Sequence, residues 1–203
     1  MRPSLLAALL AVTVLVGGGP VRANDGADDV LAALNRARTD PAGFAVILQT
    51  YRARMRGNRY FEPGANTWIV TQEGVAAIDE AIAALRATAP LPPVVRHAGL
   101  TQAAQDQVAW QGPRGEVGHA GEGRSTPFER MRRRGVAYRT AGENISYGAS
   151  GLQVVVDLIV DDGVPGRGHR HNILNPTYRE VGIALGPHRR YGTMCVIDFA
   201  AAR

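Results

Sequence analysis

The side chains best suited to proton transfer or metal binding are spread over separate segments of this chain. Each segment also contains glycine, which lets one backbone approach another closely. We therefore expect the segments to converge on one cavity lined by histidines and carboxylates. The candidate residues are His119, Glu143, Asp161, Asp162 and His169.

Two kinds of chemistry fit these residue types. Imidazole nitrogens and a carboxylate oxygen are suitable ligands for Zn²⁺ or a similar divalent cation, and three protein ligands would leave one position for water. Without a metal, the same groups can share protons in an electrostatic network. Scattered histidines do not form a compact ligand motif, so the residues themselves leave both alternatives open.

Periodicity distinguishes between neighbouring candidates. Residues 152–162 are expected to form a helix whose apolar face continues to Asp162. This favours Asp162 as the inward carboxylate, with Asp161 as the alternative because helix ends fray. Of the two histidines that follow, we expect His169 to face inward and His171 to be exposed or structural.

The first 23 residues have the three parts of a secretory signal: a basic start, an apolar run and small residues ending at Ala23. The apolar run of about 12 residues is too short for a membrane span, which needs about 20. We expect cleavage after Ala23, no transmembrane anchor thereafter, and secretion to the periplasm or the extracellular space. Residues 24–203 are long enough for a single domain that includes an N-terminal helical region.

Composition excludes several functional classes. With 45% hydrophobic and 20% charged residues, the chain is typical of globular proteins. The formal charge of +5 falls to about +3 without the signal, too little to predict nucleic-acid binding. The sequence contains no phosphate-binding glycine loop with lysine, no HExxH, no paired cysteines and no Gly-x-Ser-x-Gly motif. Its single cysteine, Cys195, cannot form an intramolecular disulfide and is expected to be buried.

Hydrophobic spacing predicts helices that alternate with loops, followed by strands. The predicted helices cover approximately residues 28–38, 41–51, 71–87, 98–111, 127–134 and 152–162. The fifth of these is expected to begin with a capping box formed by Thr126 and Glu129. A short strand or turn is expected at 141–148, and two antiparallel strands at 180–186 and 191–200, joined by a loop that contains His188. Residues 60–70 are expected to form an irregular loop with a short extended piece. The arginine run from Arg130 to Arg134 is interpreted as a solvated helix face.

The order of these motifs resembles the CAP superfamily, which contains cysteine-rich secretory proteins, antigen 5 and pathogenesis-related 1 proteins and is also called the SCP domain. The resemblance covers most of the chain after Ala23. It rests on Leu34 to Arg38, Leu100 to Ala109, Gly118-His119, Ala141 to Ile145, Gly168 to Leu174 and Val181 to Ile183.

The resemblance implies an α+β fold, a three-layer α-β-α sandwich with a central antiparallel sheet between helices. It also implies a cleft with two histidines and two acidic residues. His119, Glu143 and His169 match that tetrad, and the fourth position falls at Asp161 or Asp162. Relatives hold divalent ions in this cleft or bind sterols and other lipids. Without the cysteines of the eukaryotic branch, the chain resembles the disulfide-free bacterial type.

The leading functional hypothesis is an exported CAP-domain binding or interaction protein. Its partner would be a small ligand, a lipid or an extracellular protein, and its cleft would accept a divalent cation such as zinc. The alternatives are a zinc-dependent, peptidase-like hydrolase, with Glu143 as the proton acceptor from metal-bound water, and a lipid or sterol carrier. Catalysis is less favoured because no nucleophile motif is present.

Overall fold

The computed structural model describes residues 25–61 and 68–202, so the predicted signal lies outside the described residues. The helices are α1 (Asp25–Thr39), α2 (Pro41–Ala53), α3 (Val75–Ala87), α4 (Ala98–Arg114), α5 (Pro127–Arg133), α6 (Leu152–Val160) and α7 (Gly168–Ile173), with a short 3-10 turn η1 (Glu122–Arg124). The strands are β1 (Met55–Arg56), β2 (Arg59–Phe61), β3 (Trp68–Val70), β4 (Val95–Arg96), β5 (Tyr138–Tyr147), β6 (Glu180–His188) and β7 (Gly192–Ala202).

The main sheet has the strand order β4-β6-β7-β5. Strands β5, β6 and β7 are antiparallel, and the two-residue β4 pairs in parallel with β6 at one edge. Strand β7 lies between two neighbours and is covered on both faces, which explains the unbroken burial of residues 194–201. Strand β5 is the opposite edge, and it carries Glu143.

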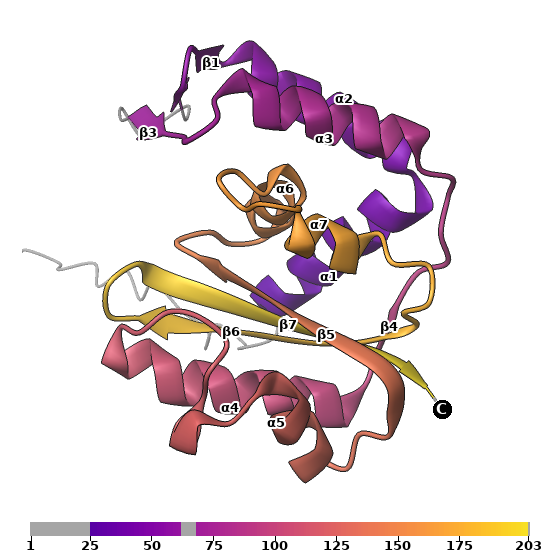
Figure 1. Cartoon of the computed structure of the whole chain (residues 1–203), viewed down its shortest axis with the longest axis vertical. Coiled ribbons are helices and arrows are strands. Elements are labelled where there is room, and N and C mark those ends of the chain that lie inside the picture. Colours follow the sequence, from indigo (N-terminus) through magenta and orange to yellow (C-terminus); the bar gives the residue numbers. More distant parts are fainter. Residues whose placement is uncertain (1–24, 62–67, 203) are drawn as a thin grey trace, which may run out of the picture.

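Helices cover both faces of this sheet (Figure 1). One face is covered by α4 and α5, and the other by α1, α6 and α7. The predicted α-β-α sandwich is therefore confirmed. Its sheet is antiparallel except at β4, and α2 and α3 add an outer helical layer that packs against α1 and α6. A small antiparallel sheet of β1, β2 and β3 lies at one end of that layer.

Two glycines in β6 allow α4 to lie directly against the sheet. A Cβ atom at Gly182 would stand 2.0 Å from the carbonyl carbon of Leu100, and one at Gly186 would stand 2.4 Å from the Cγ1 of Val108. Both distances are far below van der Waals contact. Because these two positions of β6 carry no side chain, α4 packs directly against the strand. This holds α4, and the loop that follows it, close to the sheet.

Arg38 joins the N-terminal helix to the C-terminal half of the chain. The side chain is fully buried, and its guanidinium donates to four backbone carbonyls. The acceptors are those of Pro92, Ile173, Asn175 and Tyr178. Burial, with a contribution from Arg179, lowers the pKa of Arg38 to about 10, so the side chain remains charged at neutral pH.

Most of the predicted elements are found in the structure. The segment 60–70 was expected to be an irregular loop with an extended piece, and it contains β2 and β3, with residues 62–67 outside the described part. Cys195 is buried in β7 as expected, and burial raises its pKa to about 12. Within residues 25–61 and 68–202, no helix has both the length and the apolar character needed to cross a bilayer.

We predict that Arg38→Leu lowers the free energy of unfolding by about 3 kcal/mol, because buried carbonyls lose their donors. Urea denaturation measures the loss. Arg36→Leu on the same helix is the control, since Arg36 is exposed, and it should change the value by less than about 0.5 kcal/mol. Equal stability of the two variants would contradict the role assigned to Arg38.

Candidate functional site

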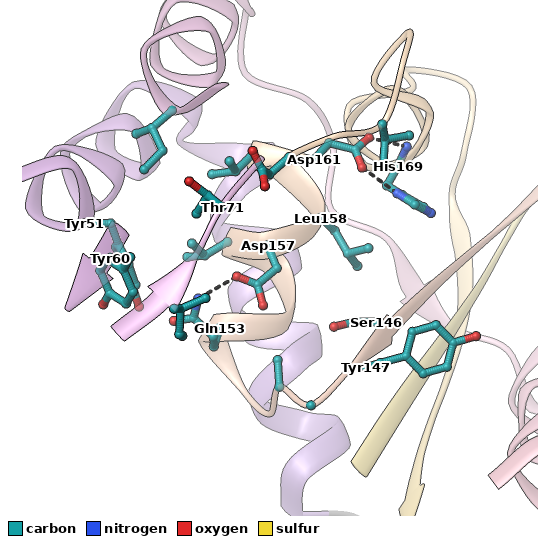
Figure 2. Close-up of a pocket in the computed structure, with 18 of the residues that line it drawn as sticks. Tyr51, Tyr60, Thr71, Ser146, Tyr147, Gln153, Asp157, Leu158, Asp161 and His169 are labelled. Carbon is teal, nitrogen blue, oxygen red and sulfur yellow. Dashed lines mark hydrogen bonds and ion pairs between the residues drawn. The ribbon is translucent and has the colours of Figure 1, made fainter. Parts of the chain in front are cut away.

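Four of the five candidate residues form two imidazole–carboxylate pairs. The Nδ1 of His119 lies 2.8 Å from Oε1 of Glu143. The Nδ1 of His169 lies 2.6 Å from Oδ1 of Asp161, a contact visible in Figure 2. The His119 side chain is 50% exposed, whereas that of Glu143 is 1% exposed. Each pair therefore presents an imidazole held from behind by a buried carboxylate.

The buried Glu143 carboxylate is shared between His119 and an arginine of α5. Its Oε2 accepts a hydrogen bond from Nη2 of Arg130 at 2.5 Å. The Nη1 of Arg130 also donates to the carbonyls of His119 (3.1 Å) and Ser125 (3.0 Å). Arg130 thus fixes both the carboxylate and the backbone of the histidine that the carboxylate contacts.

The interpretation of Arg130 as part of a solvated helix face is wrong, because its side chain is only 3% exposed. The spacing of residues along α5 could have predicted that Arg130 is buried. Pro127, Arg130 and Met131 are the buried residues of α5, at positions i, i+3 and i+4. The predicted capping box is confirmed, with Thr126 and Glu129 bonded reciprocally at the start of the helix.

The loop that carries His119 has no regular structure of its own and is held by side chains from α4. The Nε2 of Gln107 donates to the carbonyls of Gly118 and Ala120, and the Nε2 of Gln111 donates to that of Gly118 at 2.7 Å. Both glutamines are fully buried, one helical turn apart. Their polar character in a buried face was the signal that sequence reasoning overlooked.

Residues of the sheet make a second set of contacts with this loop. The Tyr147 hydroxyl accepts from the backbone N–H of Gly118 and donates to Oε1 of Gln111. Burial raises the pKa of Tyr147, which keeps this hydroxyl protonated. His188, which we expected to be a loop residue, is instead a buried residue of β6 with its Nε2 2.8 Å from the carbonyl of Glu116. The ring of His188 also packs edge-on against Tyr147.

The preference for Asp162 over Asp161 as the inward carboxylate is wrong. Helix α6 ends at Val160, and Asp161 takes a left-handed conformation (φ 56°), so the helical periodicity used to rank the two residues stops before them. The oxygens of Asp161 accept from Nδ1 and N of His169. Those of Asp162 instead accept from the backbone N–H groups of Gln72 and Glu73.

Ion pairs of two arginines connect the segment around Asp161 and His169 to α3 and to the residue just before it. Arg167, itself at a positive φ of 53°, binds Glu73 and Glu80 through its two terminal nitrogens and donates to the carbonyl of Asp161. Arg170 is buried and binds Glu80 at 2.9 Å. The position of His169 therefore depends on ion pairs with α3 and with Glu73 just before it, about 90 residues earlier in the chain.

The two pairs approach strand β5 from opposite faces. Consecutive residues of a strand point to opposite sides. Glu143 reaches Arg130 and the His119 loop on the side of α5, whereas Asn144 donates to the carbonyl of His169 in α7 at 3.0 Å. Asn144 is fully buried and also accepts from Asn172. His171, in contrast, is exposed as expected.

A further buried carboxylate lies beside Glu143. Asp198 of β7 is directly opposite Glu143 in the strand register and is fully buried. Burial, and then the charge of Glu143, raise the pKa of Asp198 well above its usual range, which favours the neutral acid. No donor among the described residues reaches its oxygens, whereas the neutral acid can donate its own proton to Glu143. The sequence placed Asp198 in an apolar strand and did not mark it as part of the site.

The donors that this arrangement leaves for a metal are the two imidazole Nε2 atoms. Each Nδ1 contacts a carboxylate, as in the outer sphere of many metal sites. Among residues 25–61 and 68–202, however, no three histidine, cysteine, aspartate or glutamate side chains are arranged around one ion. A zinc site normally takes at least three protein ligands, so the described residues do not fit such a centre, and zinc binding by His119 and His169 stays a prediction.

An apolar pocket of about 620 Å³ adjoins one of the pairs. It is bounded by the outer helical layer with its small sheet, by α6 and by the end of β5. Both Asp161 and His169 line it. Figure 2 shows them at one end, Tyr51 and Tyr60 on one side, and Ser146 and Tyr147 on the opposite side, at β5. His119 and Glu143 are not among the described lining residues.

Comparison with known proteins shows which family the chain matches. The family model described as CAP, the cysteine-rich secretory protein family, matches residues 80–199, which is more than half of the chain. The uncharacterized protein YkwD of Bacillus subtilis (strain 168) is 40% identical over 58 residues. That segment is 29% of this chain and 21% of the relative, so the similarity spans about a fifth of the relative's length.

Three solved structures are similar to part of this chain. An extracellular protein containing an SCP domain from Bacillus anthracis str. Ames is 21% identical (TM-score 0.44, 54% of this chain and 34% of that chain). An outer surface protein from Borrelia burgdorferi is 16% identical (TM-score 0.48, 56% and 80%). A cysteine-rich secretory protein from Staphylococcus aureus subsp. aureus Mu50 is 16% identical (TM-score 0.39, 63% and 38%). Since these scores are low, the fold is assigned from the helices and strands of this chain.

We predict that His119 and His169, when neutral, carry their proton on Nδ1, because a carboxylate accepts from that nitrogen in both pairs. Long-range proton–nitrogen correlation spectra at mildly alkaline pH identify the protonated nitrogen. Asp161→Asn should release this preference at His169 alone, and Asp162→Asn should leave both rings unchanged. A proton on Nε2 of His169 in the wild-type protein would contradict the geometry.

The ion pairs of Arg167 with Glu73 and Glu80 predict how the stability of the protein depends on pH. Hydrogen bonds from Arg167 and from the N–H of Gly163 lower the pKa of Glu73 from 4.5 to about 2, and Arg167 also lowers the pKa of Glu80. The stabilisation by these pairs is thus complete above the unfolded pKa and is lost as the pH falls towards that of folded Glu73. The urea midpoints of wild type and Arg167→Gln should differ at pH 6 and converge as the pH approaches 2. Arg36→Gln, at an exposed position, should show no such convergence.

Proposed function

The chain belongs to the CAP family, and from this premise we propose that it is an exported protein that binds a small apolar ligand in the pocket beside the Asp161–His169 pair. The pocket carries the proposal. Its volume of about 620 Å³ lies within the range of roughly 300–1,000 Å³ that is common for small-molecule sites, which are also mainly apolar with a few polar groups.

The walls of the pocket come from two parts of the chain. The tyrosine pair Tyr51–Tyr60, together with Ile69 and Ile78, lies before residue 80, outside the range that matches the family. The opposite wall comes from α6 and the end of β5, inside that range. The outer helical layer therefore adds a wall to the CAP sandwich, which supports a ligand specific to this kind of chain.

The geometry favours binding over hydrolysis. Both oxygens of Glu143 are already bonded, one to His119 and one to Arg130. A proton acceptor for an attacking water needs an accessible oxygen, and the Glu143 side chain is 1% exposed. The three ligands of a zinc hydrolase are also not assembled by the described residues.

Export is proposed from the signal-like residues 1–23, which lie outside the described part of the structure. Cation binding is proposed as a separate, weaker property of His119 and His169. Each histidine leaves one ring nitrogen for a ligand, and two imidazoles alone supply fewer donors than a structural zinc site requires. The apolar pocket does not depend on this cation.

Titration with the neutral fluorophore N-phenyl-1-naphthylamine tests the pocket. We expect saturable binding of one probe per chain. Val160→Trp should weaken it by about tenfold or more, corresponding to about 1.4 kcal/mol, because Val160 lines the pocket and the larger ring occupies its space. The control is Leu152→Trp in the same helix, which adds the same ring at an exposed position outside the described lining.

The control variant should bind within about twofold of wild type, a difference well below 1 kcal/mol. Equal binding by wild type and Val160→Trp would place the probe elsewhere and exclude the proposed pocket as its site. Unsaturable fluorescence in all three proteins would mean that the protein has no defined site for a neutral apolar molecule.

A further inference from the structure

A second pocket, of about 510 Å³, lies between α4 and α5, the two helices that cover one face of the main sheet (Figure 1). This α4–α5 pocket shares none of its described lining residues with the apolar pocket. Its wall is rich in charge, with four arginines and two carboxylates among the described lining residues. These six residues are Asp106, Arg114, Glu122, Arg130, Arg133 and Arg134.

Two buried donors in the wall of the α4–α5 pocket have no hydrogen-bond partner among the described residues. They are the hydroxyl of Ser125 and Nε of Arg130, and each of these residues is only 3% exposed. The terminal nitrogens of Arg130 already bind Glu143 and two backbone carbonyls, so Nε is the nitrogen left without an acceptor. Buried polar atoms nearly always have a partner. These two donors therefore indicate an acceptor that enters the pocket from outside the chain.

Exposed arginines in the same wall attract negative charge. The guanidinium of Arg134 is neutralised by Asp106, with contacts of 2.8 and 2.5 Å. Arg114 and Arg133 are exposed, and neither forms an ion pair with a carboxylate of residues 25–61 or 68–202. Arg114 stands over the ring of Trp110, 5.0 Å from its centroid. Positive charge and an aromatic surface thus lie side by side in this pocket.

One carboxylate of the wall opposes this charge. Glu122 of η1 is exposed and lines the pocket, and its side chain forms no ion pair within the part of the chain that the structure describes. Two exposed arginines face this one carboxylate, because Arg134 is paired with Asp106 and Arg130 with Glu143. The exposed wall therefore remains positive, and removing the charge of Glu122 would make it more so.

We infer that the α4–α5 pocket binds a phosphate monoester, with its phosphate at Ser125, Arg130 and Arg133 and its organic group against Trp110. A phosphate monoester has three terminal oxygens and a charge of about −1.5 to −2 at pH 7, and it accepts strong hydrogen bonds from guanidinium groups. A carboxylate offers two oxygens and a single charge, so it satisfies fewer of these donors. Trp110 is half-buried and supplies a contact that inorganic phosphate lacks.

Three small aromatic molecules test the ligand class. Phenyl phosphate, benzoate and phenol share one ring and differ in the group that it carries. Each is titrated calorimetrically into the full protein at pH 7.5 and low salt, in a buffer without phosphate. We expect saturable binding of one phenyl phosphate per chain, benzoate weaker by about fivefold or more, and no saturable binding of phenol.

Substitutions in the wall test the position of the phosphate. Ser125→Ala and Arg133→Gln each remove a donor and should weaken phenyl phosphate binding by about threefold to tenfold. Arg132→Gln is the matched control, because it removes the same charge at an exposed position of α5 outside the described lining, and it should stay within about twofold of wild type. Glu122→Gln should instead tighten binding by about threefold, an effect that loss of structure does not produce.

A phosphate monoester is present both in soluble esters and at the surface of a bilayer that contains phosphatidic acid. Sedimentation with phosphatidylcholine vesicles, prepared with and without phosphatidic acid, distinguishes these sources. Sedimentation that requires phosphatidic acid and is weakened by Arg133→Gln supports a lipid headgroup as the ligand. Saturable binding of phenyl phosphate without sedimentation supports a soluble ester.

The inference is overturned if phenyl phosphate does not bind saturably, or if phenol binds as well as it does. It is also overturned if Ser125→Ala and Arg133→Gln both bind phenyl phosphate as wild type does. Equal weakening by Arg132→Gln and Arg133→Gln would show that net charge alone attracts the anion, which excludes the pocket as its site. None of these results affects the apolar pocket, whose probe is neutral and whose described lining is separate.

Discussion

The buried contact between Arg130 and Glu143 is the interaction on which the arrangement of this site depends. A carboxylate with 1% exposure is costly to bury unless a cation and further donors compensate it. The cation comes from α5, the carboxylate from edge strand β5, and the second donor from His119 in the preceding loop. Because one guanidinium also binds the backbone of that loop, helix, loop and strand must reach their places together, and removing either charge would leave the other buried without its partner.

On the opposite face of β5, a second buried carboxylate is also compensated by hydrogen-bond donors from other elements. Asp161 is buried and compensated by the ring and backbone N–H of His169. Arg167 binds Glu73 just before α3, and Arg170 binds Glu80 within α3. Asn144, next to Glu143 in the strand, connects the two halves by binding the backbone of His169. Edge strand β5 therefore supports two separate imidazole–carboxylate pairs rather than one compact ligand cluster. Because of this separation, the described residues present two oriented imidazoles, of which only His169 lines the pocket, and no three-ligand metal centre.

The apolar pocket lies where the CAP sandwich meets the outer helical layer. Neither part encloses it alone, since its tyrosine wall precedes the family match and its α6 wall lies within that match. The ion pairs of Arg167 with Glu73 and Glu80 hold these two parts together close to the pocket. Binding and the position of His169 are thus expected to share a physical basis, because both depend on how α3 docks against the turn after α6.

The sequence by itself determined most helices and strands, because hydrophobic periodicity and capping are local properties that neighbouring residues express. The fold class and the candidate histidines and carboxylates followed from the order of motifs that resembles the CAP superfamily. The fold class, the capping box at Thr126 and the burial of Cys195 are all confirmed. Only the tertiary structure decided between Asp161 and Asp162, turned Arg130 inward, and placed His188 and Asp198 in buried positions. These outcomes depend on where a helix ends and on which distant partner compensates a buried charge. Both are set by contacts between segments up to about 90 residues apart, such as Glu73 with Arg167, and no local pattern of residues encodes them.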